Sequence, residues 1–237
     1  MDIGTTPRDA EAERAVIAGT ARSKDIVLRF DALADGESLT WDTDGDPAPS
    51  LEELQSRRAG QFEWSPDLEG PPRWRTTVTR RSSETAARTV SDALAWDHDR
   101  LDALEREAFA ARGRGDAAEA IRLFDAFARG LDRHIAFEEA LLFPAFENAT
   151  GHPATAGPTA VMREEHRIIR ALLAEIAAGM RDPAASPEDR RRSLGWVLEE
   201  HNVKEEQILY PMTDAALGPD GADELVRQIQ AFRSRAD

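Results

Sequence analysis

The chain contains no cysteine among its 237 residues. This absence excludes disulfide bonds, thiolate catalysis, sulfur relay and thiolate-bound metals, so any metal must be held by nitrogen and oxygen atoms. The sequence also lacks a run of 18 apolar residues, and we therefore expect no segment that spans a membrane. The N-terminal stretch is acidic and has no apolar core, so we expect no signal peptide and a cytoplasmic location.

Basic charge is scarce as well. Thirty lysines and arginines stand against 45 aspartates and glutamates, which gives a formal net charge of −15. Binding to nucleic acid phosphates or to an anionic lipid surface requires a basic surface. We therefore expect neither nucleic acid nor a membrane as a partner, and we interpret the acidity as that of a well-solvated surface.

Residues 1–80 have the pattern of a small α/β domain. Short apolar or alternating stretches predict strands, the first of them at an edge of the sheet, and two stretches with helical spacing or a capping box predict helices. The expected order is strand, helix, strand, helix, strand, strand, at 16–18, 26–33, 39–41, 50–60, 62–64 and 74–78. The polar segment 79–85 is the predicted linker to the remainder of the chain.

Residues 84–237 are predicted to be almost entirely helical. Four stretches each carry one apolar stripe with steps of three and four residues, as expected for a helix that faces a core. Glycine or proline interrupts the stripes at 113–115, 151–158 and 182–187, and a short terminal helix is expected at 224–232. The chain is thus predicted to be an α+β protein of two domains, a small α/β sandwich followed by an antiparallel four-helix bundle.

Four of the five histidines lie on the apolar stripes, near the middle of the four helices: His98, His134, His166 and His201. A bundle interior favours apolar side chains, and a buried polar group is destabilising unless it has a partner. Histidines at matching depth on four helices can share a metal as that partner. The fifth histidine, His152, lies in a glycine- and proline-containing turn and is expected at the surface.

An internal repeat adds two carboxylates to these histidines. The segment HIAFEEALLFP begins at His134, and the segment HNVKEEQILYP begins at His201, so both read H-x-x-x-E-E-x-x-L-[FY]-P. Positions i and i+4 lie on one face of a helix, so His134 can bind the same ion as Glu138, and His201 the same ion as Glu205. We interpret the bundle as two copies of one helical hairpin, in which the proline would kink or end the helix beyond the ligands.

The predicted metal centre has six ligands: His98, His134, Glu138, His166, His201 and Glu205. The simplest arrangement gives two histidines to each of two ions and lets both glutamates bridge them. Imidazole and carboxylate without thiolate suit iron, manganese or zinc, and an open, bridged site of high coordination number favours iron or manganese over zinc. Iron is the metal we expect. A bridging oxide or hydroxide would join two iron ions and leave room for a small ligand.

Acidic residues also stand next to the predicted ligands. Glu139 and Glu206 directly follow the two ligand glutamates; they are candidates for outer hydrogen-bond acceptors or for surface residues, and we expect the surface. Glu165 precedes a ligand histidine and is a candidate either to support a ligand or to replace one.

These motifs resemble the hemerythrin-like (HHE cation-binding) family over roughly residues 84–215. The resemblance implies a helical bundle that holds two iron ions with the six ligands named above. Oxygen-carrying hemerythrins have a fifth histidine four residues from the one on the third helix, where this chain has Met162 and Arg170, which argues against reversible oxygen carriage. The set of four histidines and two carboxylates looks more like bacterial nitric-oxide-stress proteins that repair iron centres, but those carry a cysteine-bearing N-terminal segment.

The N-terminal stretch FDALADGESLTWDTDGDPAPSLEELQSRRAGQFEW, followed by GPPRWR, resembles a domain of unknown function with a small sulfur-carrier-like fold. That domain is found in bacteria beside hemerythrin-like domains. True sulfur carriers of this fold use a cysteine, so the resemblance does not imply sulfur transfer here. We expect this half to be a binding or docking module for a protein partner.

Three functions fit these observations. The first is a non-haem di-iron protein that binds dioxygen or nitric oxide and reports this through the N-terminal domain, and it is favoured because that domain shows no catalytic residues. The second is an enzyme that activates dioxygen or detoxifies nitric oxide or peroxide, with electrons supplied from outside because the sequence has no flavin or nicotinamide motif. The third is iron storage, iron donation or the repair of iron centres.

Overall fold

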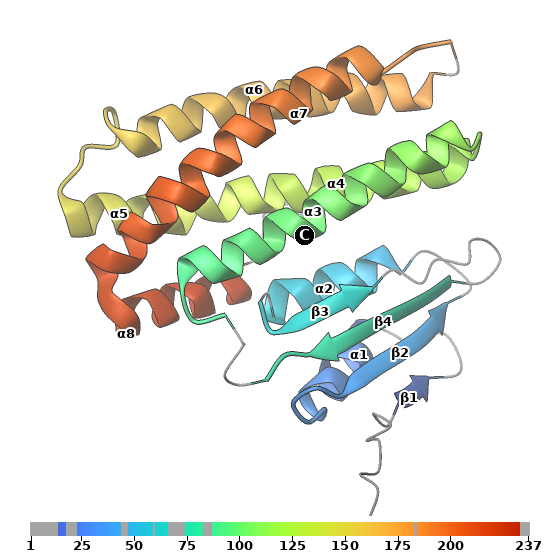
Figure 1. The fold of residues 1–237 in the computed structure, drawn as a ribbon, viewed down its shortest axis with the longest axis horizontal. Coiled ribbons are helices and arrows are strands. Elements are labelled where there is room, and N and C mark those ends of the chain that lie inside the picture. The colour runs from blue at the N-terminus through green and yellow to red at the C-terminus, as the bar shows by residue number, and fades with distance from the viewer. Residues whose placement is uncertain are drawn as a thin grey trace, which may run out of the picture.

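The computed structural model describes residues 14–17, 23–43, 47–58, 60–65, 74–82, 87–182 and 184–232. An α/β domain is followed by a helical domain, and the two lie against each other in Figure 1. The predicted fold class, a small α/β sandwich before a helical bundle, is therefore confirmed. We propose residues 1–80 and 84–237 as the limits of the two domains. Among the helices that the structure describes, none is both long enough and apolar enough to cross a membrane.

The N-terminal domain has its elements in the predicted order: β1 (Arg14–Ile17), α1 (Ser23–Asp31), β2 (Ser38–Thr43), α2 (Ala48–Arg58), β3 (Phe62–Ser65) and β4 (Trp74–Arg80). Its described strands form one sheet in the order β1-β2-β4-β3, with β1 parallel to β2 at the edge and the other pairs antiparallel. Most predicted limits differ from the observed ones by one to three residues. Helix α2 begins before Ser50, because the carbonyl of Pro47 already accepts from the Ser50 N–H, and β4 continues through Thr79, which pairs with Ser38.

The core of the N-terminal domain lies between α1, α2 and one face of the sheet. Successive strand residues point to opposite faces, so alternate positions of β2, β3 and β4 supply one apolar surface. The buried core consists of Ile26, Val27, Phe30, Leu39, Trp41, Leu51, Leu54, Phe62 and Val78. The other sheet face is polar, and there the hydroxyls of Thr40 and Thr77 share a hydrogen bond of 2.8 Å.

The helical domain consists of α3 (Val90–Gly113), α4 (Ala117–Phe137), α5 (Phe143–Thr150), α6 (Pro158–Arg181), α7 (Glu188–Lys204) and α8 (Tyr210–Ala231), with two π-helical segments, η1 (Glu138–Leu142) and η2 (Glu205–Leu209). The chain turns at the three predicted interruptions. The expected terminal helix is the last part of α8, which bends at Gly218 (φ 70°, ψ 175°). In Figure 1, α8 turns back beneath the bundle toward α2.

Each repeat segment contains one of the π-helical turns. Pro144 and Pro211 have no N–H to donate to the carbonyl four residues earlier, and their rings would clash with it. The preceding N–H groups reach one residue further back, from Phe143 to Glu138 and from Tyr210 to Glu205. The chain stays helical past both prolines through a π turn, so the prolines do not end their helices. Such turns frequently occur at functional sites, and both begin at predicted ligands.

Two apolar clusters fill the bundle on either side of its centre. One includes Leu101, Leu131 and Ile169, and the other includes Leu94 and Met162. The histidine of each helix lies between a residue of the first cluster and a residue of the second. The predicted ligands therefore form a polar layer inside an otherwise apolar core.

The two domains share a packed interface. The ring of Phe62 on β3 meets Trp96 of α3 edge-on, with a centroid distance of 5.0 Å. The guanidinium of Arg122 on α4 lies 4.3 Å from the ring centroid of Trp74 on β4. In Figure 1, α2 also lies on the side of the N-terminal domain that faces the bundle.

Candidate metal centre

The six predicted ligands come together at the centre of the bundle, and none is more than 5% exposed: His98, His134, Glu138, His166, His201 and Glu205. Helix α3 supplies His98, α4 supplies His134, and η1 supplies Glu138. In the second half, α6 supplies His166, α7 supplies His201, and η2 supplies Glu205. Side-chain nitrogen and oxygen atoms of these residues lie close enough to surround metal ions.

The first half of the centre contains His98 and His134. Their Nε2 atoms lie 3.2 Å apart. A Glu205 oxygen lies 3.5 Å from Nε2 of His98, and a Glu138 oxygen lies 3.5 Å from Nε2 of His134. All four donors therefore face one point.

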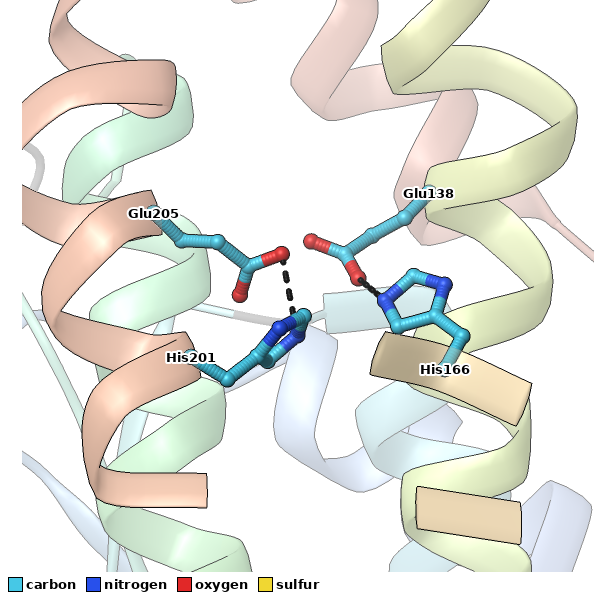
Figure 2. Close-up of side chains that lie close together, drawn as sticks. All are labelled: Glu138, His166, His201 and Glu205. Atoms are coloured by element: carbon cyan, nitrogen blue, oxygen red, sulfur yellow. Dashed lines mark ion pairs between the residues drawn. The ribbon is translucent and has the colours of Figure 1, made fainter. Parts of the chain in front are cut away.

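The second half contains His166 and His201, drawn with both glutamates in Figure 2. Nε2 of His166 lies 3.3 Å from Oε2 of Glu138, and Nε2 of His201 lies 3.2 Å from Oε1 of Glu205. Each glutamate thus directs one oxygen to each half, the geometry that a bridging carboxylate needs. Adjacent donors bound to one ion lie roughly 3.0–3.4 Å apart at ordinary bond lengths, so these separations fit.

Three inward-facing atoms of the second half have no hydrogen-bond partner within the described residues: Nε2 of His166, Oε2 of Glu138 and Oε1 of Glu205. Buried polar atoms without partners are rare, and each is destabilising. A cation bound between the three atoms would satisfy all of them at once. The donor set present therefore fits a metal ion.

Four outer carboxylates hold the histidine rings. Nδ1 donates to a carboxylate oxygen in each case, over 2.7–3.0 Å, in the pairs His98–Glu206, His134–Asp97, His166–Glu139 and His201–Glu165. Because an ionised carboxylate only accepts, the proton of each neutral ring stays on Nδ1 and the lone pair of Nε2 faces inward, as metal binding requires. Glu206 is exposed and Glu139 is half-buried, so both reach the surface as expected, and both also accept from a histidine, which was the alternative expectation.

The same carboxylates make the rings basic. Burial lowers the pKa of His98, but hydrogen bonds with Glu205 and Glu206 outweigh burial and raise that pKa to about 10. Burial likewise lowers the pKa of His166, but the nearby carboxylates of Glu138 and Glu139 outweigh burial and raise that pKa to about 9. Protons and metal ions therefore compete for Nε2.

His152 lies outside the centre, as predicted. It is exposed, and its Nδ1 atom lies 2.9 Å from the hydroxyl of Thr150. Met162 belongs to the apolar core, and Arg170 binds Asp132 and Glu139 through its guanidinium. The positions where oxygen carriers have a further histidine thus add no nitrogen ligand within the described part of this chain.

Two residues that touch the centre were not anticipated from the sequence. The Tyr210 hydroxyl lies 2.7 Å from Oε1 of Glu138 and 2.8 Å from Oε2 of Glu205. Gln55, on α2 of the N-terminal domain, donates to Oδ1 of Asp97. The only signal for Tyr210 was the phenylalanine-or-tyrosine position of the repeat, and nothing in the sequence pointed to Gln55.

Comparison with known families agrees with the resemblances inferred from the sequence. The uncharacterized conserved protein family DUF2249 matches residues 14–80. The hemerythrin HHE cation binding domain matches residues 89–213, more than half of the chain. No curated protein and no solved structure gives a significant match. The chain belongs to the hemerythrin HHE cation-binding family.

Proposed function

We propose that the centre holds two iron ions, binds dioxygen or nitric oxide, and reports this binding through the N-terminal domain. Family membership and the buried donor set support cation binding. His98 and His134 would hold one ion, His166 and His201 the other, and the two glutamates would bridge them. Nitrogen and oxygen donors without thiolate suit iron, with manganese and zinc as the alternatives. Bound iron would supply the position to which a diatomic molecule attaches.

One shared carboxylate carries the proposal that the N-terminal domain reports the state of the centre. Oδ2 of Asp97 accepts from Nδ1 of His134 at 2.9 Å. Oδ1 of the same residue accepts from Gln55, and also from Nε of Arg100 at 3.0 Å. Asp97 and Gln55 are both buried, at 2% and 4% exposure. A side chain of the N-terminal domain is thus one hydrogen-bonded residue away from a predicted ligand.

This connection gives the domains a physical means of influencing each other. Binding of a diatomic ligand would change the charge of the bridged pair of ions, and with it the strength with which His134 donates to Asp97. A buried carboxylate that accepts a weaker hydrogen bond from one donor accepts stronger ones from its other donors, because hydrogen bonds in a network of low dielectric depend on one another. The contact with Gln55 on α2 should respond, and by linkage a partner bound to the N-terminal domain should alter affinity at the centre.

A cleft reaches the outer edge of the centre. It has a volume of about 690 Å³, lies between α3 and α7, and is lined at one point by His98 and Glu206. A diatomic ligand can therefore approach from solvent along the edge of a predicted ligand. The same access supports the alternative function, an enzyme that activates dioxygen or detoxifies nitric oxide or peroxide, which needs an external electron donor.

Hydrogen exchange of α2 amides tests the proposed reporting. Reduced, iron-loaded protein is compared before and after addition of nitric oxide, and we expect exchange across 48–58 to change. In Gln55→Leu the change should be lost, while Arg100 still satisfies Asp97 and preserves the fold. Gln61→Leu is the matched control, since Gln61 also crosses the domain interface, to Gln230 at 3.2 Å, without touching the centre. An α2 response that is absent, or equal in both variants, would contradict the proposal.

Turnover separates the sensing function from the enzymatic one. With excess reductant and dioxygen or nitric oxide, a sensor should consume no more than about one equivalent per centre. Sustained consumption of reductant by iron-loaded protein, with none by metal-free protein, would show an enzyme instead.

A further inference from the structure

The two halves of the centre differ at one repeat position. Phe143 in the first repeat segment corresponds to Tyr210 in the second, and both directly precede a proline. The Phe143 ring stacks on His166, with centroids 5.5 Å apart and planes 15° apart. Tyr210 instead brings a hydroxyl to the half that contains His98 and His134. At this repeat position, the first half of the centre therefore has one inward-facing oxygen atom that the second half lacks.

The Tyr210 oxygen lies among the donors of that half. It is 2.7 Å from Oε1 of Glu138, 2.8 Å from Oε2 of Glu205, and 3.4 Å from Nε2 of both His98 and His134. These separations lie close to the roughly 3.0–3.4 Å expected between adjacent donors on one ion. The phenol oxygen thus completes a group of five donors around the first half, whereas the second half has four.

Hydrogen bonding alone does not explain this position. A phenol has one proton, but two carboxylate oxygens lie within hydrogen-bond distance of it, and only one can accept at a time. Tyr210 is fully buried, at 0% exposure, so the other oxygen gains no replacement from solvent at this side chain. A cation shared by the phenol oxygen and both carboxylates would remove the conflict.

We propose that Tyr210 is a seventh ligand, whose oxygen binds the ion held by His98 and His134. This inference rests on the proposal that the centre holds two iron ions. The phenol proton is released to solvent as the ion binds, and no electrons are transferred. The ion held by His166 and His201 would have one protein donor fewer.

Raman spectroscopy of ferric protein gives a direct test. A phenolate bound to ferric iron produces a visible charge-transfer band, and excitation in that band enhances the ring vibrations of the tyrosine. Tyr210 is the only tyrosine in the chain, and there is no cysteine to give a thiolate band. Any tyrosinate vibration that shifts when the protein is made with ring-deuterated tyrosine must therefore come from Tyr210.

Three results are distinguishable. Two irons per chain with deuterium-sensitive tyrosinate vibrations, lost in Tyr210→Phe while two irons remain, are the expected outcome. Two irons without those vibrations would overturn the tyrosine assignment and leave the proposed function intact. Failure of the wild-type protein to take up iron would overturn both proposals. Tyr210→Phe only restores the residue type of the first repeat, and circular dichroism of the variant verifies its fold.

Discussion

Replacing Asp97 with asparagine should reverse the tautomer of a predicted ligand. Oδ1 of Asp97 accepts from two donors, Gln55 and Arg100, while Oδ2 accepts from Nδ1 of His134. In Asp97→Asn the two donors retain the amide oxygen, so the amide nitrogen faces the histidine ring. The ring must then accept at Nδ1, which places its proton on Nε2, the atom that faces the predicted ion.

The magnitude follows from the position of Asp97. Loss of an outer hydrogen-bond partner typically reduces metal affinity about 10- to 100-fold, or roughly 1.4–2.7 kcal/mol. A reversed tautomer blocks the ligand atom itself, and Asp97 is only 2% exposed, so water does not readily take its place. We therefore expect the upper end of that range, for one of the two ions.

Competition with a chelator measures this effect. One of two iron equivalents should leave Asp97→Asn at about 100-fold lower chelator concentration than in wild type, and the other should be retained. Glu165→Gln should give a smaller loss, because Glu165 is partly exposed and also binds Lys204. Glu164→Gln, at an exposed neighbour that binds Arg167, is the control. Wild-type affinity at both positions in Asp97→Asn would refute the reasoning.

Three other predictions concern the ligands, pH and packing. His134→Ala should bind fewer than two irons per chain by elemental analysis, whereas His152→Ala should bind as wild type does, and the reverse result would show that the site is misplaced. In metal-free protein, the raised pKa values of His98 and His166 stabilise the fold fully below about pH 6.5, and this contribution is lost as pH rises through 9–10. Denaturant unfolding should therefore show that the free energy of unfolding falls by roughly a few kcal/mol across that pH window. A free energy of unfolding that does not change with pH there would contradict the prediction. Gly130→Ala should lower the free energy of unfolding by about 1–3 kcal/mol, because a Cβ there would lie 2.7 Å from a methyl group of Leu101 on α3. An unchanged denaturation midpoint would show that α3 and α4 can move apart to accommodate the methyl group.

The sequence predicted the features that depend on spacing along one helix. Steps of three and four residues place side chains on one face whatever packs against them, so the helices and their interruptions could be located. His134 and Glu138 are four residues apart, and their common face follows from helix geometry alone. The structure brings all six predicted side chains together, and their binding of metal stays a prediction.

Spacing was misleading where the backbone departs from the α-helix. Pro144 and Pro211 suggested interrupted helices, but hydrogen bonds from Phe143 to Glu138 and from Tyr210 to Glu205 form π turns instead. The extra residue in such a turn rotates the following side chains around the helix. Rules for an ideal α-helix therefore do not locate the residues that follow the ligand glutamates.

Partners across helices and domains were decided only by the tertiary structure. The amino-acid pattern by itself determined which residues share a face, and hence the repeat, the buried histidines and the two glutamates. It did not determine that Glu139 meets His166 across η1 and α6, or that Gln55 meets Asp97 from 42 residues away. Contacts of that kind depend on the rotation and separation of packed elements, which the whole core sets together rather than any local stretch of sequence.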